Sequence, residues 1–130
     1  MSANETALRE AFAAAGRGDP GPLVDLYADD FVWAGWNFEG GQQIYTKSEF
    51  LAALGVLAKL DEAATEIVST ETVSGDIVIA KVRAYRRLGS EVLDTTIVMV
   101  HRFTGGKVTG GADVCPAAFE DFWRKTGITG

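Results

Sequence analysis

The second half of the chain has the pattern of four successive β-strands, and this limits the possible folds more than any other feature. Apolar and polar residues alternate with period two over residues 65–73, 77–87, 92–103 and 108–115. Short segments containing Ser74-Gly75-Asp76, Leu88-Gly89-Ser90 and Gly105-Gly106 separate these stretches and are typical of hairpin turns. Strands joined by such short turns pair antiparallel. The sequence therefore predicts a mainly antiparallel sheet.

The first half of the chain predicts helices instead. Ser2 with Glu5, and Thr46 with Glu49, have the spacing of capping boxes, in which two residues at a helix start bond each other's backbone. Apolar residues at helical spacing follow each pair. We therefore expect one helix after Ser2, ending at the glycines near residue 16, and a second after Thr46 that runs to about Leu60.

Shorter elements lie between and after these two helices. Asp19-Pro20 predicts a short helix through about Tyr27, which the paired acids Asp29 and Asp30 would end. The aromatic stretch 31–38 predicts a strand. Beyond the four strands, Pro116 is suited to begin a last helix over residues 116–126.

Helices followed by antiparallel strands are typical of the α+β class, with the helices packed on one face of the sheet. We expect residues 1–130 to form one domain, since a chain of this length supports a single core. A long, strongly curved sheet wrapped around the N-terminal helices gives a cone-shaped α+β barrel. A cone closed at one end encloses a natural cavity for a small molecule.

Composition excludes several classes of protein. The net charge is −6, which disfavours binding to nucleic acid. No apolar run approaches the ~20 residues that span a bilayer, and the N-terminus has no pattern of a secretory signal. The single cysteine, Cys115, suits a reducing cytoplasm. One histidine and one cysteine cannot build a zinc site of the usual kind, and no glycine loop for a phosphate or dinucleotide is present, so we expect no metal and no cofactor.

His101 and Asp113 are the candidate catalytic residues. Arg102 prefers water, so alternation turns His101 toward the inner face of the sheet. A two-residue Gly-Gly turn would pair His101 with Gly110 and place Asp113 on the outer face, whereas a three-residue loop with a bulge would pair Met99 with Asp113 and place both groups inside. A shift of the strand pairing by one residue moves every side chain of the strand to the opposite face of the sheet. We predict the second arrangement.

Each of the two residues has a structural alternative. An inward Asp113 with few partners would suit acid/base work, but an aspartate there could also bond backbone at a turn or strand edge. His101 would be a base or a hydrogen-bond donor to the substrate, or a core histidine bonded to a backbone carbonyl. The predicted substrate-binding residues, which would line the cavity or its mouth unless they are plain core, are Trp33, Trp36, Phe38, Tyr45, Met99 and Gly111.

Three stretches, GDPGPLVDLYADDFVWAG, TKSEFLAALGVL and HRFTGGKV, resemble the cystatin-like α+β barrel superfamily, which includes the nuclear transport factor 2-like and SnoaL-like families. The resemblance extends to about Cys115. In the SnoaL-like pattern, a Gly-Lys-Val turn such as residues 106–108 comes shortly before a cavity-facing aspartate or histidine. The resemblance therefore implies that Asp113 is a general acid/base.

Ketosteroid isomerase and scytalone dehydratase share this fold, and the former needs an aspartate base, a tyrosine and a second aspartate. The matching positions hold Gly35, Ala11 and Met99, which argues against steroid isomerisation of that kind. The resemblance also implies a homodimer formed through the sheet, for which the polar face of residues 81–87 is available.

Together these observations predict a cofactor-independent acid/base enzyme of the isomerase, cyclase or dehydratase type. Its substrate would be a small hydrophobic molecule that carries a carbonyl group. The alternative is a domain of the same fold that binds a small molecule or dimerises without catalysis. In that case His101 and Asp113 would be satisfied structural groups.

Overall fold

The computed structural model describes residues 1–38 and 41–128. It contains a six-stranded sheet with the order β2-β1-β6-β5-β4-β3. The strands are β1 (Tyr27–Asn37), β2 (Gly41–Thr46), β3 (Glu62–Val73), β4 (Ile77–Leu88), β5 (Glu91–Thr104) and β6 (Lys107–Val114). The helices are α1 (Ala3–Gly16), α2 (Gly21–Leu26), α3 (Lys47–Leu54), the short 3-10 helix η1 (Gly55–Lys59) and α4 (Ala117–Thr126).

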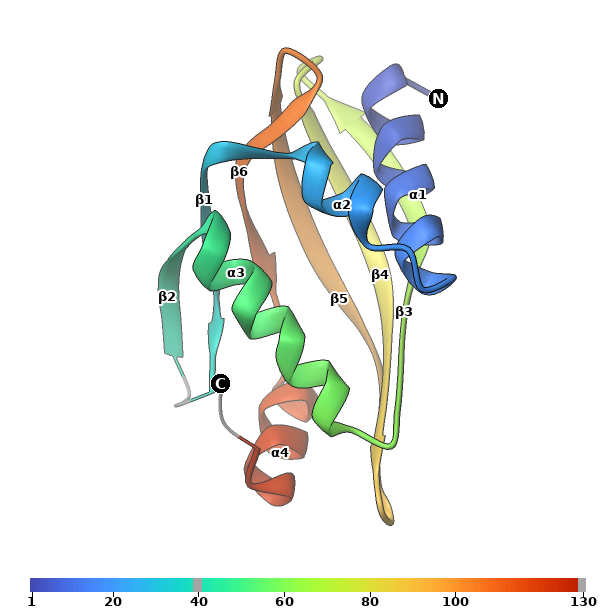
Figure 1. Cartoon of the computed structure of the whole chain (residues 1–130), viewed down its shortest axis with the longest axis vertical. Helices are drawn as coiled ribbons and strands as arrows, with labels where there is room; N and C mark the ends of the chain where they lie inside the picture. Colours follow the sequence, from blue (N-terminus) through green and yellow to red (C-terminus); the bar gives the residue numbers. More distant parts are fainter. Residues whose placement is uncertain (39–40, 129–130) are drawn as a thin grey trace.

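The sheet is strongly curved, and α1, α2 and α3 lie together over one of its faces (Figure 1). The helix α4 lies at the opposite end of the molecule from the β5–β6 turn (Figure 1). Neighbouring strands pair antiparallel except for β1 and β6, which are parallel. These features confirm the predicted α+β class and the cone-like, mainly antiparallel sheet. The cone is open, because β2 and β3 are edge strands that do not pair with each other.

Both predicted helix starts are confirmed by their capping hydrogen bonds. The backbone N–H of Glu5 donates to Ser2 Oγ at 3.1 Å, and Ser2 N–H donates back to Glu5 Oε2 at 3.2 Å. Thr46 and Glu49 form the same reciprocal pair at 3.0 and 3.3 Å. The α-helix after Thr46 ends at Leu54 and not near Leu60, and the chain continues as η1 from Gly55. Glycine is a poor residue for a helix interior.

The prediction that Asp29 and Asp30 end a helix is wrong, since α2 stops at Leu26 and β1 already begins at Tyr27. Tyr27 and Phe31 are buried at the start of β1, with ring centroids 4.8 Å apart, and the two acids between them are exposed. The strand β2 was not predicted. Only Tyr45 of its six residues is buried, so a polar edge strand carried no clear alternation.

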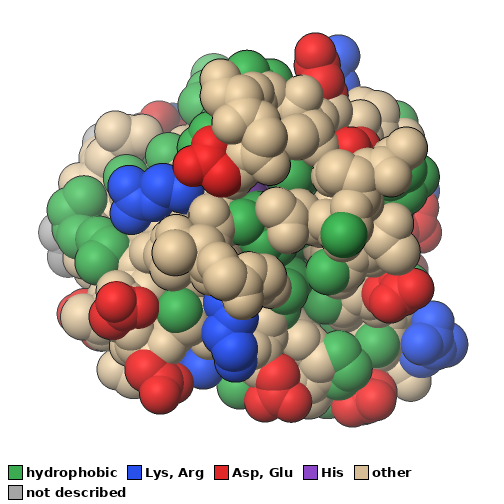
Figure 2. All heavy atoms as spheres, turned by 90° about the horizontal axis from the view of Figure 1, so that it is seen from above, with side chains coloured by type: hydrophobic (Ala, Val, Ile, Leu, Met, Phe, Trp, Pro, Cys, Tyr) green, Lys and Arg blue, Asp and Glu red, His purple; other side chains and the backbone are tan. Residues whose placement is uncertain are grey.

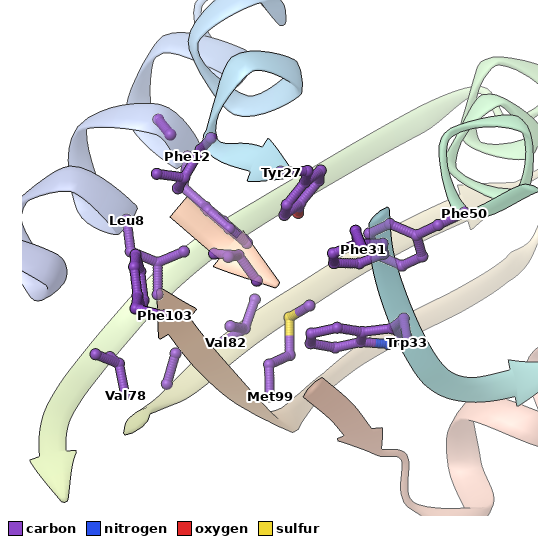
Figure 3. Close-up of a cluster of buried hydrophobic side chains, with 14 of the residues drawn as sticks. Leu8, Phe12, Tyr27, Phe31, Trp33, Phe50, Val78, Val82, Met99 and Phe103 are labelled. Carbon is purple, nitrogen blue, oxygen red and sulfur yellow. The ribbon is translucent and has the colours of Figure 1, made fainter. Parts of the chain in front are cut away.

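The core fills the space between the helices and the inner face of the sheet. Figure 3 shows Leu8 and Phe12 reaching down from α1, and Met99 pointing toward Trp33. The inner face of β4 alternates as predicted, with Val78, Ala80, Val82 and Ala84 buried and the side chains between them more exposed.

The β5–β6 hairpin has the predicted register at Asp113, but a bulge in β6 produces it and not the predicted loop. The predicted three-residue loop is wrong: Gly105 and Gly106 form a two-residue turn, with φ of 59° and 81°, and Thr104 pairs with Lys107. The register then shifts between Arg102 and Phe103, leaving Thr109 without a partner on β5, as in a β-bulge. Beyond this bulge Met99 pairs with Asp113, as predicted.

Seen from the end that carries this turn, acidic and basic side chains are interspersed around the molecule (Figure 2). Over the described ranges 1–38 and 41–128, no helix is both long enough and apolar enough to cross a membrane.

Candidate functional site

A cavity of about 630 Å³ lies between the helices and the concave face of the sheet. This volume is in the range of small-molecule sites. Helices α1, α2 and α3 with η1 supply an apolar cover that includes Phe12, Leu23, Phe50 and Leu54. The sheet supplies Ile97 and most of the polar groups, of which the main ones are Arg86, Asp113 and Glu66.

Asp113 is held on the cavity wall by hydrogen bonds from three protein groups. Trp33 Nε1 donates to Oδ2 at 2.9 Å and the backbone N–H of Trp36 donates to Oδ1 at 3.1 Å. The Cys115 thiol approaches Oδ1 at 3.6 Å. An ionised carboxylate has about four acceptor positions. The arrangement therefore orients the carboxylate and leaves acceptor capacity for a ligand.

Glycines make room for this arrangement. A Cβ at Gly35 would lie 3.1 Å from Asp113 Oδ2 and 3.0 Å from the Trp33 ring. A Cβ at Gly111 would collide with the Val100 carbonyl oxygen and with the Trp33 ring. Gly111 does not line the cavity. The Trp33 indole, which donates to Asp113, occupies the space beside Gly111.

His101 faces the inner side of the sheet, as alternation predicted, but lies behind Trp33. Its side chain is 0 % exposed, its ring centroid is 5.3 Å from that of Trp33, and it is not among the residues that line the cavity. Neither ring nitrogen has a hydrogen-bond partner of normal geometry among the described residues. Burial lowers the pKa of His101 to about 4, and the backbone of Val78 offsets this only in part.

The other predicted binding residues divide into two groups. Trp36, Phe38, Tyr45 and Met99 line the cavity. Trp33 does not; it is 0 % exposed and packs against Phe31 and Phe50, with centroids 5.7 and 5.3 Å away. Trp33 therefore contacts Asp113 and not the cavity itself.

Two further groups near Asp113 are kept in their neutral forms. Burial raises the pKa of the Tyr45 hydroxyl, and the charges of Asp113 and Glu49 add to this. The hydroxyl donates to the carbonyl oxygen of Trp36 at 2.9 Å. Burial and the neighbouring Asp113 likewise raise the pKa of Cys115, so its thiol is a poor nucleophile.

Arg86 was not predicted as a site residue, but it lines the cavity and is 4 % exposed. It lies two residues beyond Ala84 on the inner face of β4. Extending the alternation of β4 from Ala84 by one more step therefore predicts that Arg86 points inward. Burial lowers the pKa of its guanidinium to about 10. Within residues 1–38 and 41–128, no cluster of three or more acidic, histidine or cysteine side chains is placed to hold a metal ion.

The geometry thus defines a class of protein, an open α+β cone with an apolar cavity and a carboxylate fixed on its wall. The model of the SnoaL-like domain matches residues 8–111, and the chain belongs to this family. Among curated proteins, none matches the chain significantly.

Solved structures share the fold over nearly the whole chain. Bal32a, from a soil-derived mobile gene cassette, is similar with a TM-score of 0.81 and 22 % identity, over 94 % of this chain and 97 % of its own. TerC, co-crystallised with polyporic acid, gives 0.78 and 18 % over 95 % and 99 %. IdmH, a proposed polyketide cyclase of Streptomyces antibioticus, gives 0.76 and 14 % over 96 % and 99 %. At these identities the likeness shows the fold.

Proposed function

We propose that this protein is a cofactor-independent acid/base enzyme that acts on a small, mostly apolar molecule carrying a carbonyl group. The observation that carries the proposal is the Asp113 carboxylate, oriented by Trp33 and Trp36 on the wall of an apolar cavity. Membership of the SnoaL-like family, and structural neighbours that include a proposed polyketide cyclase and a protein crystallised with polyporic acid, support a small organic ligand.

In the proposed reaction Asp113 takes a proton from the carbon next to the carbonyl group. The C–H electrons move into the carbonyl, which becomes an enolate, and Asp113 becomes a carboxylic acid. Returning the proton at another position gives isomerisation. Attack of the enolate carbon on a second carbonyl of the same molecule gives cyclisation, and the alkoxide formed takes the proton back from Asp113. His101, which lies behind Trp33, would act as a positioning residue because Trp33 donates to Asp113.

The proposal is tested by proton exchange at carbon. The protein is incubated in D₂O with 2-tetralone, a planar aromatic ketone, and the loss of the α-proton NMR signals is followed. We expect exchange above the buffer rate, and a decrease of about 10² to 10⁴ in Asp113→Asn, since a positioned general base contributes that much. Asp94→Asn is the matched control, because Asp94 pairs with Arg83 on an exposed part of the sheet.

A second function is favoured by one observation. Three protein donors already contact the Asp113 carboxylate, which is what a non-catalytic ligand-binding domain of the same fold would show. Quenching of tryptophan fluorescence by 2-tetralone reports binding separately from exchange. Binding without exchange by the wild-type protein would contradict the enzyme proposal and support the binding domain.

A further inference from the structure

Arg86 is a buried cation at one end of the cavity. Its side chain extends from the inner face of β4, and the residue opposite on β5 is Leu93. A pKa of about 10 keeps the guanidinium protonated at neutral pH. A charge in such a position is costly unless a partner offsets it.

The partners of Arg86 are neutral. Nη1 donates to the carbonyl oxygens of Ala64 and Tyr85 at 2.8 and 2.9 Å, and Nη2 donates to Thr65 Oγ1 at 2.9 Å. Within the described part of the chain, no ion pair reaches Arg86, and its buried Nε has no hydrogen-bond partner.

The neighbouring arginines differ in this respect. Arg83 on the opposite face pairs with Asp94 at 2.7 Å, and Arg87 pairs with Glu62 at 3.0 Å. Glu66 lines the cavity, but its carboxylate lies 3.9 Å from Arg83. Arg83 and Arg87 are thus paired with acids, while the buried Arg86 has no acidic partner among the described residues.

Further unpaired donors lie in the same wall. The indole N–H groups of Trp36 and Trp123 are buried and have no partner within residues 1–38 and 41–128, and both side chains line the cavity. Trp123 packs in one cluster with Leu93, the residue opposite Arg86, and the same cluster includes Trp36, whose backbone N–H donates to Asp113. The cavity wall therefore carries the Arg86 cation and two indole N–H donors without acceptors among the described residues.

We propose that Arg86 binds an anionic oxygen of the ligand, either a carboxylate or an ionised enol or phenol. This names the substrate class for the proposed function, on which it rests: an elongated, otherwise apolar molecule with an oxyanion at the end remote from Asp113. Positions along β5 show how far apart the two groups lie. The Arg86 guanidinium donates to Thr65, which lies at the level of Thr95 on β5, because Thr65 pairs with Ala84 and Ala84 pairs with Thr95. Asp113 lies at the level of Met99, with which it pairs. Four residues of strand separate these levels, roughly 13 Å, so one small functional group does not contact both.

The test compares two ligands of nearly the same shape, the anion 2-naphthoate and the neutral 2-naphthamide, by titration calorimetry at pH 7. We expect the wild-type protein to bind the anion more tightly by about tenfold to a hundredfold, the usual contribution of a hydrogen bond to a charged group. Arg86→Met keeps the length of the side chain and removes the charge. In this variant the preference should vanish while the affinity for 2-naphthamide stays within about twofold.

Two control variants make the result specific. Arg83→Met removes an arginine from the same strand on the opposite face, and Asp113→Asn removes the proposed base; both should keep the preference for the anion. Loss of proton exchange in Asp113→Asn and loss of anion preference in Arg86→Met are separate readouts, so either proposal can fail alone. Equal affinities for the two ligands in the wild-type protein, or a preference that survives Arg86→Met, would overturn the inference.

A measurement on the wild-type protein covers the case in which Arg86→Met does not fold. The ¹⁵N resonance of Arg86 Nε reports directly on the unpaired N–H. It should shift when 2-naphthoate is added and stay unchanged with 2-naphthamide. A resonance that ignores both ligands would contradict the proposal.

Discussion

His101 makes the stability of the fold depend on pH, and the size of the effect follows from its burial. The imidazole has an ordinary pKa of 6.5 in the unfolded chain and about 4 in the folded protein. Because the unfolded state binds the proton more tightly, acid favours unfolding. Above pH 6.5, His101 is neutral in both states and does not lower the free energy of unfolding. The free energy of unfolding then decreases as the pH falls from 6.5 toward 4. At about 1.4 kcal/mol per pH unit, the whole loss is about 3 kcal/mol, and about 2 kcal/mol of it has occurred by pH 5.

The assay is urea unfolding of the wild-type protein, His101→Gln and His101→Leu at pH 7.5 and pH 5. The two variants cannot take up a proton at this position. We expect each to lose about 2 kcal/mol less than the wild type between the two pH values. For each protein, the free energy of unfolding at pH 5 is subtracted from that at pH 7.5. A substitution that changes the packing equally at both pH values therefore does not affect the result.

Arg102→Gln is the matched control, since Arg102 is the next residue on β5 and its side chain is exposed on the other face. It should keep the pH dependence of the wild type. Equal losses in the wild type and in both His101 variants would refute the reasoning, because another group would then carry the pH dependence. An imidazole that titrates near 6.5 by NMR would refute it independently.

Two predictions concern the neighbours of Asp113. Gly111→Ala should destabilise the protein by about 3 kcal/mol or more in urea, because the added methyl group meets a backbone oxygen and the Trp33 ring; Gly55→Ala, where a Cβ has no neighbour within 4 Å, should be neutral or stabilising. Iodoacetamide at pH 8 should modify native Cys115 much more slowly than the urea-unfolded chain, because burial and Asp113 raise the pKa of its thiol, and equal rates would contradict this.

The elements that were predicted well are those whose signals are local. The capping boxes at Ser2 and Thr46 need only residues three apart, and β4 and β5 each bury one face. The edge strand β2 has no buried face except at Tyr45, so its sequence contained no period to detect. Its position depends on pairing with β1, which is a tertiary effect.

The β5–β6 hairpin shows a different limit. Two glycines and a lysine were consistent with either a two-residue or a three-residue turn, and the predicted register for Asp113 depended on the choice. The structure reaches that register with the shorter turn, because the extra residue is placed at Thr109 and not in the loop. A bulge at a threonine has no distinctive local sequence, although Gly110 next to it is a residue type that often accompanies such irregularities.

For Arg86, the preference of arginine for water and the alternation of the strand predict opposite faces of the sheet. The preference of arginine for water correctly placed Arg102 outside, and applied to β4 it would place Arg86 outside as well. The period of two places Arg86 inside, and the structure follows the period. The sheet cannot reverse one side chain without a bulge, and none interrupts the pairing of β4 with β5. The burial of this charge is therefore imposed by the register, and no acid among the described residues pairs with it. A buried charge that has no acidic partner in its own protein violates a local preference, and such violations are expected at functional sites. This is the reason to look for the missing partner of Arg86 in the ligand.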